Sequence, residues 1–278
     1  MFRLLDIELH KLKHNRASKV LLITYFALLF SIALLATIKF DIGPIKFHLA
    51  DQGIFNFPYI WHFNTYIASI FKFFLLLIIV SMVSNEYSNK TLKQNLIDGL
   101  SKKEFILSKF YAVVLFSFIS TLFVFAISLV LGLIYSDFNE LSIIFSDLEY
   151  LLAYFVKLVG FFSFGIFLGM LIKKSAFAVA AMIVWFIGET MSYNIMRFNM
   201  PNGELVSDAV YQFAPLMSMS KLIDQPFTRL NAVKTLASQV GEDVRFDYVV
   251  HWYEIAIVLG WTAIFIYGSY LLLKARDL

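Results

Sequence analysis

The hydrophobic positions of this chain fall into six long stretches that polar segments separate. A helix that spans a membrane needs about 20 mostly apolar residues, because each residue rises about 1.5 Å through a hydrocarbon core about 30 Å thick. Within these stretches apolar residues cover all sides of a helix, as expected where no side faces water. The pattern predicts an all-α polytopic membrane protein with six transmembrane helices, at residues 20–37, 66–84, 111–135, 150–172, 176–196 and 252–273.

The leader, residues 1–19, has a different pattern. Phe2, Leu5, Leu9 and Leu12 recur at helical spacing, and basic residues are available to the other side. We therefore expect an amphipathic helix that lies at the membrane interface. The first span is longer than the apolar core of a signal peptide, so we expect it to remain as an anchor.

The amino-acid composition indicates that much of the protein is surrounded by lipid. The chain has 278 residues, of which 60% are hydrophobic and 15% charged, whereas soluble domains are about half apolar and about a quarter charged. Its 31 phenylalanines suit contact with lipid. The sequence contains no cysteine, which excludes disulfides and thiolate metal sites.

Basic residues are distributed unevenly between the segments that join the spans. Lys and Arg gather in the leader, in segment 85–109, at Lys173 and Lys174, and in the C-terminal tail, whereas segment 136–148 carries acidic residues and no basic one. Basic loops stay in the cytoplasm. The distribution predicts an even number of crossings with both termini cytoplasmic.

The predicted outward segment 197–249 is too long to be a simple connection. Prolines interrupt it at Pro201, Pro215 and Pro226. The spacing of apolar residues predicts short amphipathic helices near 205–213 and 227–240, lying at the outer membrane surface. Two interpretations stay open: these helices gate an exit, or they cover the ends of the spans.

Segment 85–109, between spans two and three, contains a short predicted helix at 89–97. Leu92 and Leu96 share one face of it, and Gly99 can adopt the left-handed conformation that ends a helix. Such a helix suits a groove on another protein. The alternative is a solvated hairpin that only joins two spans.

A new helix is predicted directly afterwards. Ser101 and Glu104 fit a capping box, in which the serine accepts the amide of Glu104 and the glutamate accepts the amide of Ser101. A small transverse helix is therefore expected below the membrane.

The same loop carries a recognisable series of residues. It reads Asn85-Glu86-Tyr87, then Thr91-Leu92-Lys93-Gln94, then Gly99-Leu100-Ser101-Lys102-Lys103-Glu104 and Lys109. This series resembles the type-2 ABC exporter permeases. The match of residues is confined to 86–109, while the layout of a basic leader, six spans and a long outward connection resembles that family over the whole chain.

The resemblance implies one permease domain, 1–278, in a bacterial cytoplasmic (inner) membrane. It also implies that segment 85–109 is a cytoplasmic coupling loop that docks on a separate ABC ATPase, and that two permeases, identical or related, work with two ATPases. The residues that the resemblance assigns to this coupling are Glu86, Thr91, Leu92, Gln94, Leu96, Gly99, Lys102 and Glu104. The chain has no G-x-x-x-x-G-K-[ST] phosphate loop, so ATP and Mg²⁺ are expected on the partner. The chain itself is expected to bind no cofactor and to be no enzyme.

Three charged residues fall inside predicted spans: Lys72, Lys157 and Glu189. A charge there costs about 2.5–3.5 kcal/mol on insertion scales, so each needs a partner, water or a route to the interface. Lys157 and Glu189 are both predicted about 21–23 Å from the inner ends of their spans, at about 1.5 Å per residue. They are candidates for a structural ion pair or for contact with a substrate.

Two further patterns have modest interpretations. His10 and His14 are four residues apart, a spacing that can bind a metal ion. No third ligand is evident, so a surface pair without metal is expected. Trp61, His62 and Trp252 are expected to anchor the protein in the interfacial aromatic belt.

Two other classes of function were weighed. An ion-coupled secondary transporter would use the three intramembrane charges as a relay, but the halves show no repeat and no matching pair of broken spans. A membrane enzyme is disfavoured because the sequence has neither H-E-x-x-H nor G-x-S-x-G. Membrane lipid is an expected partner and nucleic acid is not. The sequence leaves the substrate open, and the Phe-rich spans favour an apolar or amphiphilic one.

Overall fold

The described part of the chain is helical apart from one small hairpin. A computed structural model describes residues 2–35, 39–42, 45–48, 53–229 and 248–276. The elements are α1 (Phe2–His14), α2 (Arg16–Leu35), β1 (Lys39–Ile42), β2 (Ile45–His48), α3 (Tyr59–Ile70), α4 (Lys72–Ser88), α5 (Thr91–Ile97), α6 (Lys102–Tyr135), α7 (Leu141–Ile144), α8 (Glu149–Ile172), α9 (Ser175–Asn199), α10 (Gly203–Tyr211), α11 (Pro215–Lys221), the 3₁₀ helix η2 (Phe227–Arg229) and α13 (Trp252–Lys274). The antiparallel pair β1–β2, in which Lys39 pairs with His48, was not predicted from the sequence.

The predicted polytopic helical architecture is confirmed. Helices α6, α9 and α13 and the segment Leu141–Ile172 are each long and apolar enough to cross a membrane. Two bent pairs raise the number of candidate spans from four to six: α1 meets α2 at 94°, and α3 meets α4 at 47°. The second predicted span is therefore longer than expected and is broken at Phe71.

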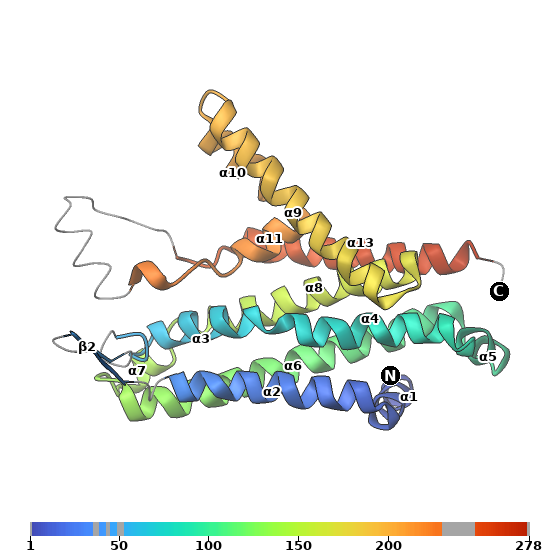
Figure 1. Ribbon diagram of the computed structural model, residues 1–278, viewed down its shortest axis with the longest axis horizontal. Coiled ribbons are helices and arrows are strands. Elements are labelled where there is room, and N and C mark those ends of the chain that lie inside the picture. Colours follow the sequence, from blue (N-terminus) through green and yellow to red (C-terminus); the bar gives the residue numbers. More distant parts are fainter. Residues whose placement is uncertain (1, 36–38, 43–44, 49–52, 230–247, 277–278) are drawn as a thin grey trace.

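Most of these helices lie side by side along one axis (Figure 1). The central one is α8, which packs against α13, α4, α6, α9, α3 and α11. One end of the body, which we call the basal end, holds α1, α5, the start of α6 and the last turn of α13 (Figure 1). The other end holds α7, β2 and η2.

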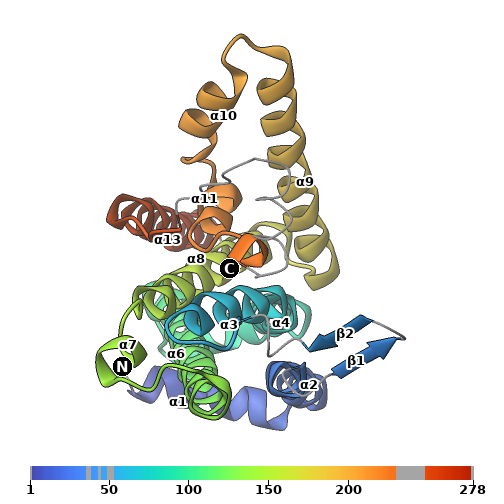
Figure 2. The same ribbon diagram turned by 90° about the vertical axis from the view of Figure 1, so that its left-hand side faces the viewer.

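Helices α9 and α10 stand away from the body as an antiparallel pair (Figures 1 and 2). The predicted break near Pro201 is confirmed, because α9 ends at Asn199 and α10 begins at Gly203. A Cβ atom on Gly203 would overlap the carbonyl oxygens of Met196 and Arg197, so the tight turn requires glycine.

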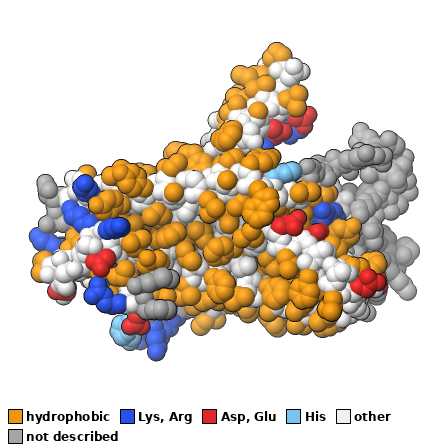
Figure 3. Space-filling model, turned by 180° about the vertical axis from the view of Figure 1, so that it is seen from behind, with side chains coloured by type: hydrophobic (Ala, Val, Ile, Leu, Met, Phe, Trp, Pro, Cys, Tyr) orange, Lys and Arg blue, Asp and Glu red, His pale blue; other side chains and the backbone are white. Residues whose placement is uncertain are grey.

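The surface is apolar around the middle and basic mainly at one end (Figure 3). Helix α2 has one buried side and one exposed apolar side. Tyr25 and Leu29 are fully buried, whereas Val20 and Ile23 are 63% and 69% exposed. Such large exposed aliphatic residues are stable where lipid replaces water.

The helix predicted near 205–213 corresponds to α10. Helix α11 was not predicted from the sequence, and its Leu216 and Met219 are buried against the other helices. The expected place of Trp61 and His62 in the interfacial belt needs correction. Both side chains are fully buried. They are held inside the body because the Trp61 Nε1 donates to the carbonyl of Ile144 at 2.9 Å and the His62 ring stacks on Tyr150. Most of the predicted helix at 227–240 lies outside the described residues.

The packing of α6 yields a stability prediction. A Cβ atom on Gly132 would overlap the buried ring of Phe57, whereas one on Gly260 of α13 meets nothing within 4 Å. Both substitutions to alanine gain the same helix propensity. We therefore expect Gly132→Ala to lose about 1–3 kcal/mol relative to Gly260→Ala through overpacking. Thermal unfolding of the detergent-solubilised protein measures the difference, and equal midpoints would contradict the packing described.

Candidate functional site

Local backbone chemistry ends the short helix α5 at the basal end and starts the next helix, α6. At its C-terminus the amide of Leu100 donates to the carbonyl of Asn95 at 3.0 Å, and that of Gly99 donates to Leu96 at 3.2 Å. Gly99 has φ +96°, as the left-handed termination requires. The predicted capping box that starts α6 is present, with Ser101 accepting from the amide of Glu104.

Four charged residues from three helices form a cluster next to α5. We call Glu8 and Lys11 of α1, Glu86 of α4 and Lys109 of α6 the basal charge network. Lys109 is buried, and its Nζ lies 2.6 Å from Glu8 Oε2 and 3.0 Å from Glu86 Oε1. Lys11 Nζ lies 2.6 Å from the same Glu86 oxygen. Each buried carboxylate therefore faces an ammonium group.

The second oxygen of Glu86 ties α5 to this network. It accepts hydrogen bonds from Thr91 Oγ1 at 2.5 Å and from Asn95 Nδ2 at 3.0 Å. Glu86 is only 4% exposed. Hydrogen bonds to a buried charged group are about twice as strong as neutral ones. Glu86 therefore joins α5 to α4 directly, and to α6 and α1 through Lys109 and Lys11.

Two more of the predicted coupling residues hold neighbouring elements together. Lys102 Nζ donates to the carbonyls of Arg276 at 2.9 Å and Lys274 at 3.3 Å, at the C-terminal end of α13. Glu104 lies 3.3 Å from Arg3 of α1. The two ends of the chain therefore meet at the start of α6.

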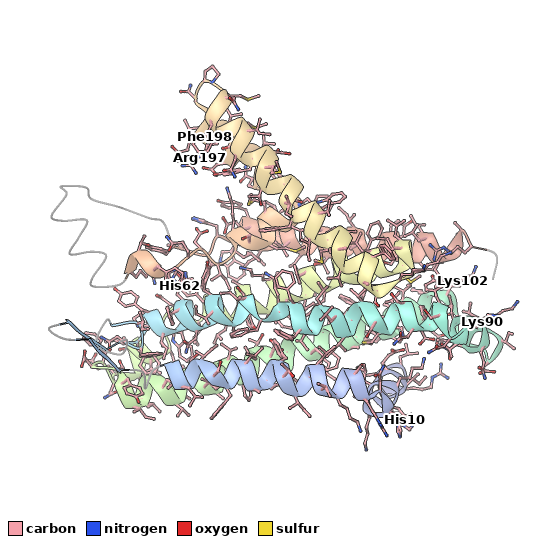
Figure 4. All side chains as sticks on the ribbon, viewed as in Figure 1. His10, His62, Lys90, Lys102, Arg197 and Phe198 are labelled. Atoms are coloured by element: carbon pink, nitrogen blue, oxygen red, sulfur yellow. The ribbon has the colours of Figure 1, made fainter. Side chains whose placement is uncertain are left out.

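The predicted apolar docking face of α5, formed by Leu92 and Leu96, is not an exposed face, and Leu96 is half-buried. Leu92 is only 2% exposed and belongs to the core of this chain, because the hydrogen bonds from Thr91 and Asn95 turn that side of α5 toward α4. The outer side carries Lys93 and Gln94, with Ile97 74% exposed. Figure 4 shows Lys90 at the outer edge of the same end.

The sequence pattern did not single out Glu8, Lys11 or Lys109 as a connected site. The position of Glu8 could have indicated a buried charge, because it lies between Leu5 and Leu12 on the side of α1 that packs against the core. A carboxylate on an apolar face needs a buried partner.

Lys157 and Glu189 do not form the ion pair that was one of the two expected arrangements. Lys157 Nζ donates to the carbonyl of Ser220 at 3.2 Å, and Glu189 accepts from the amides of Leu216 and Met217 at 3.3 and 2.7 Å. Both therefore bind α11, the lysine at its C-terminal turn and the glutamate at its N-terminus. These signs complement the helix dipole.

Lys72 is held differently. Its Nζ lies 4.6 Å from the ring centroid of Phe161 and 5.8 Å from that of Phe73. In the part of the chain that the structure describes, it makes no hydrogen bond or ion pair.

Polar contacts also connect α10 to α11. Lys221 Nζ lies 2.7 Å from Asp208 Oδ1, to which the Tyr193 hydroxyl donates at 3.0 Å. Partial burial alone would raise the pKa of Asp208, but the Lys221 ammonium outweighs it and holds that pKa below its usual value.

The histidine pair shows no metal-binding arrangement. His14 Nδ1 lies 2.9 Å from the carbonyl of His10, and both side chains are exposed. Among the described residues no three His, Cys, Asp or Glu side chains gather as a metal site.

Comparison with known families agrees with this architecture. A model described as ABC-2 family transporter protein matches residues 4–189, which include the basal charge network, Lys72 and Lys157. The chain belongs to the ABC-2 family of transporter proteins. None of the curated proteins compared with the chain matches it.

Membership of the ABC-2 family defines the general role of the chain. It is a multi-pass membrane protein and a non-catalytic transmembrane subunit. ABC-2 permeases generally pair with an ATPase subunit.

The basal charge network yields the second prediction. Lys109→Met would leave Glu8 and Glu86 close together and would remove the ammonium that both contact. We expect a loss of about 3–5 kcal/mol in the free energy of unfolding, as for other broken buried pairs. Thermal unfolding measures it, with the exposed Lys103→Met on the same helix as the matched control. An unchanged midpoint for Lys109→Met would show that the network is dispensable.

Proposed function

We propose that this ABC-2 protein is the permease subunit of an ATP-driven exporter, and that α5 is its coupling helix. The observation that carries the proposal is the attachment of α5. Thr91 and Asn95 bind Glu86, which in turn contacts Lys109, while the opposite side of α5 is uncovered. A short helix tied to the spans on one side and open on the other is suited to transmit force.

The open side of α5 has the chemistry of a docking surface. Ile97 provides an exposed apolar group, and Lys90 and Lys93 provide positive charge on the same end of the body. An ATPase groove with an apolar floor and an acidic rim would complement it. ATP and Mg²⁺ belong to that ATPase, and two permeases with two ATPases form the working transporter.

The distribution of charge supports the orientation of the protein in a bacterial inner membrane. The basal end carries α1, α5 and the end of α13, and the positive-inside rule places it in the cytoplasm with both termini. Helix α1, which meets α2 at 94°, would then lie along the inner interface. The turn at 200–203 and α10 would then lie on the outward side.

ATP would drive transport through a difference in binding. The two ATPases approach each other when ATP is bound, and they would then favour one position of α5 over another. Through Glu86 and Lys109 that position would set the tilt of α4 and α6, which opens a path outward.

The geometry gives no support to an ion-coupled mechanism. Such a relay needs neighbouring titratable groups, yet Lys157 and Glu189 bind opposite ends of α11 and do not contact each other.

The docking surface yields the third prediction. Ile97→Asp would place a charge at the centre of the contact while leaving the core of the permease intact. We expect co-purification of the cognate ATPase to fall at least about tenfold, as for other central contact residues. The control is Leu141→Asp, which changes a residue of similar exposure, 72%, in α7 at the other end.

Two outcomes decide the matter. Loss of the ATPase from Ile97→Asp alone supports docking through α5. Equal recovery of the ATPase with both variants contradicts it. Leu92→Asp is unsuitable for this test, because Leu92 is buried and its substitution would unfold the permease itself.

A further inference from the structure

A cavity of about 190 Å³ lies at the side of the membrane-spanning body, between α4, α8, α9 and α11. Residues that line it include Lys72, Phe73, Phe161, Ile183, Phe186 and Met219. Lys72 is sixteen residues before Ser88, the last residue of α4, which places it about 24 Å from that end at about 1.5 Å per residue. Apart from the Lys72 ammonium and the neighbouring Ser220, the walls are apolar.

The charges around this cavity are not paired with one another. Lys157 is buried and donates to the carbonyl of Ser220 at 3.2 Å, whereas the Lys72 ammonium faces the rings of Phe161 and Phe73. Glu189 binds the amides at the start of α11. Among the described residues, the positive charge of Lys72 therefore has no direct acidic partner. Contacts with the Phe161 and Phe73 rings offset only part of its cost.

The cavity borders the lipid-facing surface. Phe73, Ile183 and Phe186 line it and are 44%, 45% and 45% exposed. On the inner side it is closed by Phe161 and Met219, which are buried. A molecule can therefore enter from the side, out of the bilayer.

We propose that this cavity binds the acidic group of an anionic amphiphile, whose apolar part lies against the exposed side chains of α4 and α9. A single negative charge matches the positive charge of Lys72, and a salt bridge in hydrocarbon is strong because water does not compete. The apolar walls exclude a small inorganic anion that brings no apolar surface of its own. If the chain is an exporter, as proposed above, this amphiphile is the class of its cargo.

Lipid binding to the purified permease alone tests the site without an ATPase. Native mass spectrometry compares retention of phosphatidylglycerol, which carries one negative charge, with that of phosphatidylcholine with the same acyl chains. The variants are Lys72→Met, which removes the charge, and Lys72→Arg, which keeps it. Lys103→Met is the control for an exposed lysine at the basal end.

We expect the preference for phosphatidylglycerol to fall about tenfold in Lys72→Met and to be retained in Lys72→Arg and Lys103→Met, as for loss of a desolvated charge pair. An unchanged preference in a folded Lys72→Met protein overturns the proposal. If Lys72→Met does not fold, Ile183→Trp decides, because it fills the cavity and keeps both lysines. Unchanged retention by Ile183→Trp likewise overturns the proposal.

A transport experiment distinguishes a lipid that is exported from a lipid that stays bound. The permease and its ATPase are reconstituted in vesicles, and ATP-dependent outward movement of fluorescent phosphatidylglycerol is measured. Movement that Lys72→Met abolishes identifies cargo; binding without movement identifies a resident lipid, and both support the site. If ATP drives no movement of any substrate, the proposed export function fails while the binding result stands.

Discussion

A single ammonium group organises the basal end of this ABC-2 permease. Lys109 lies between carboxylates from α1 and α4, and both carboxylates are buried. Buried charges are costly unless they are paired, and Lys109 is the buried partner that both acids share, while the half-buried Lys11 lies 2.6 Å from Glu86 and 4.0 Å from Glu8. Charge balance thus sets how α1, the end of α4 and the start of α6 pack together. Helix α5 joins this cluster because Thr91 and Asn95 donate hydrogen bonds to Glu86.

The charged residues around α11 are also balanced by polar contacts, but not by one another. These charges come from helices whose side chains do not reach each other, so Lys157 and Glu189 bind the two ends of α11. This short helix is thereby held inside the body, next to the cavity around Lys72. The acids and ammonium groups of the basal charge network are paired with each other, whereas Lys72 has no acidic partner among the described residues, and this difference separates a structural cluster from a candidate binding site.

Features that depend on local sequence could be predicted. The helical body and its apolar runs follow from residue type, and the glycine turn at Gly99 and the capping box at Ser101 follow from backbone chemistry. Features that join distant segments could not. Glu8 and Lys109 are 101 residues apart, and α11 is too short to show a clear pattern. On α5, periodicity shows that Leu92 and Ile97 lie on different sides, but not which of them the body covers.

The length of α6 has a mechanical consequence. It has 34 residues and is about 51 Å long at about 1.5 Å per residue, well beyond the thickness of the hydrocarbon core. It starts beside α5 and ends at the opposite end of the body, where Gly132 contacts Phe57. An unbroken helix of this length behaves as a lever. A small rotation at the end next to α5 swings the far end by a larger distance, without any need for a chain of side-chain rearrangements in between.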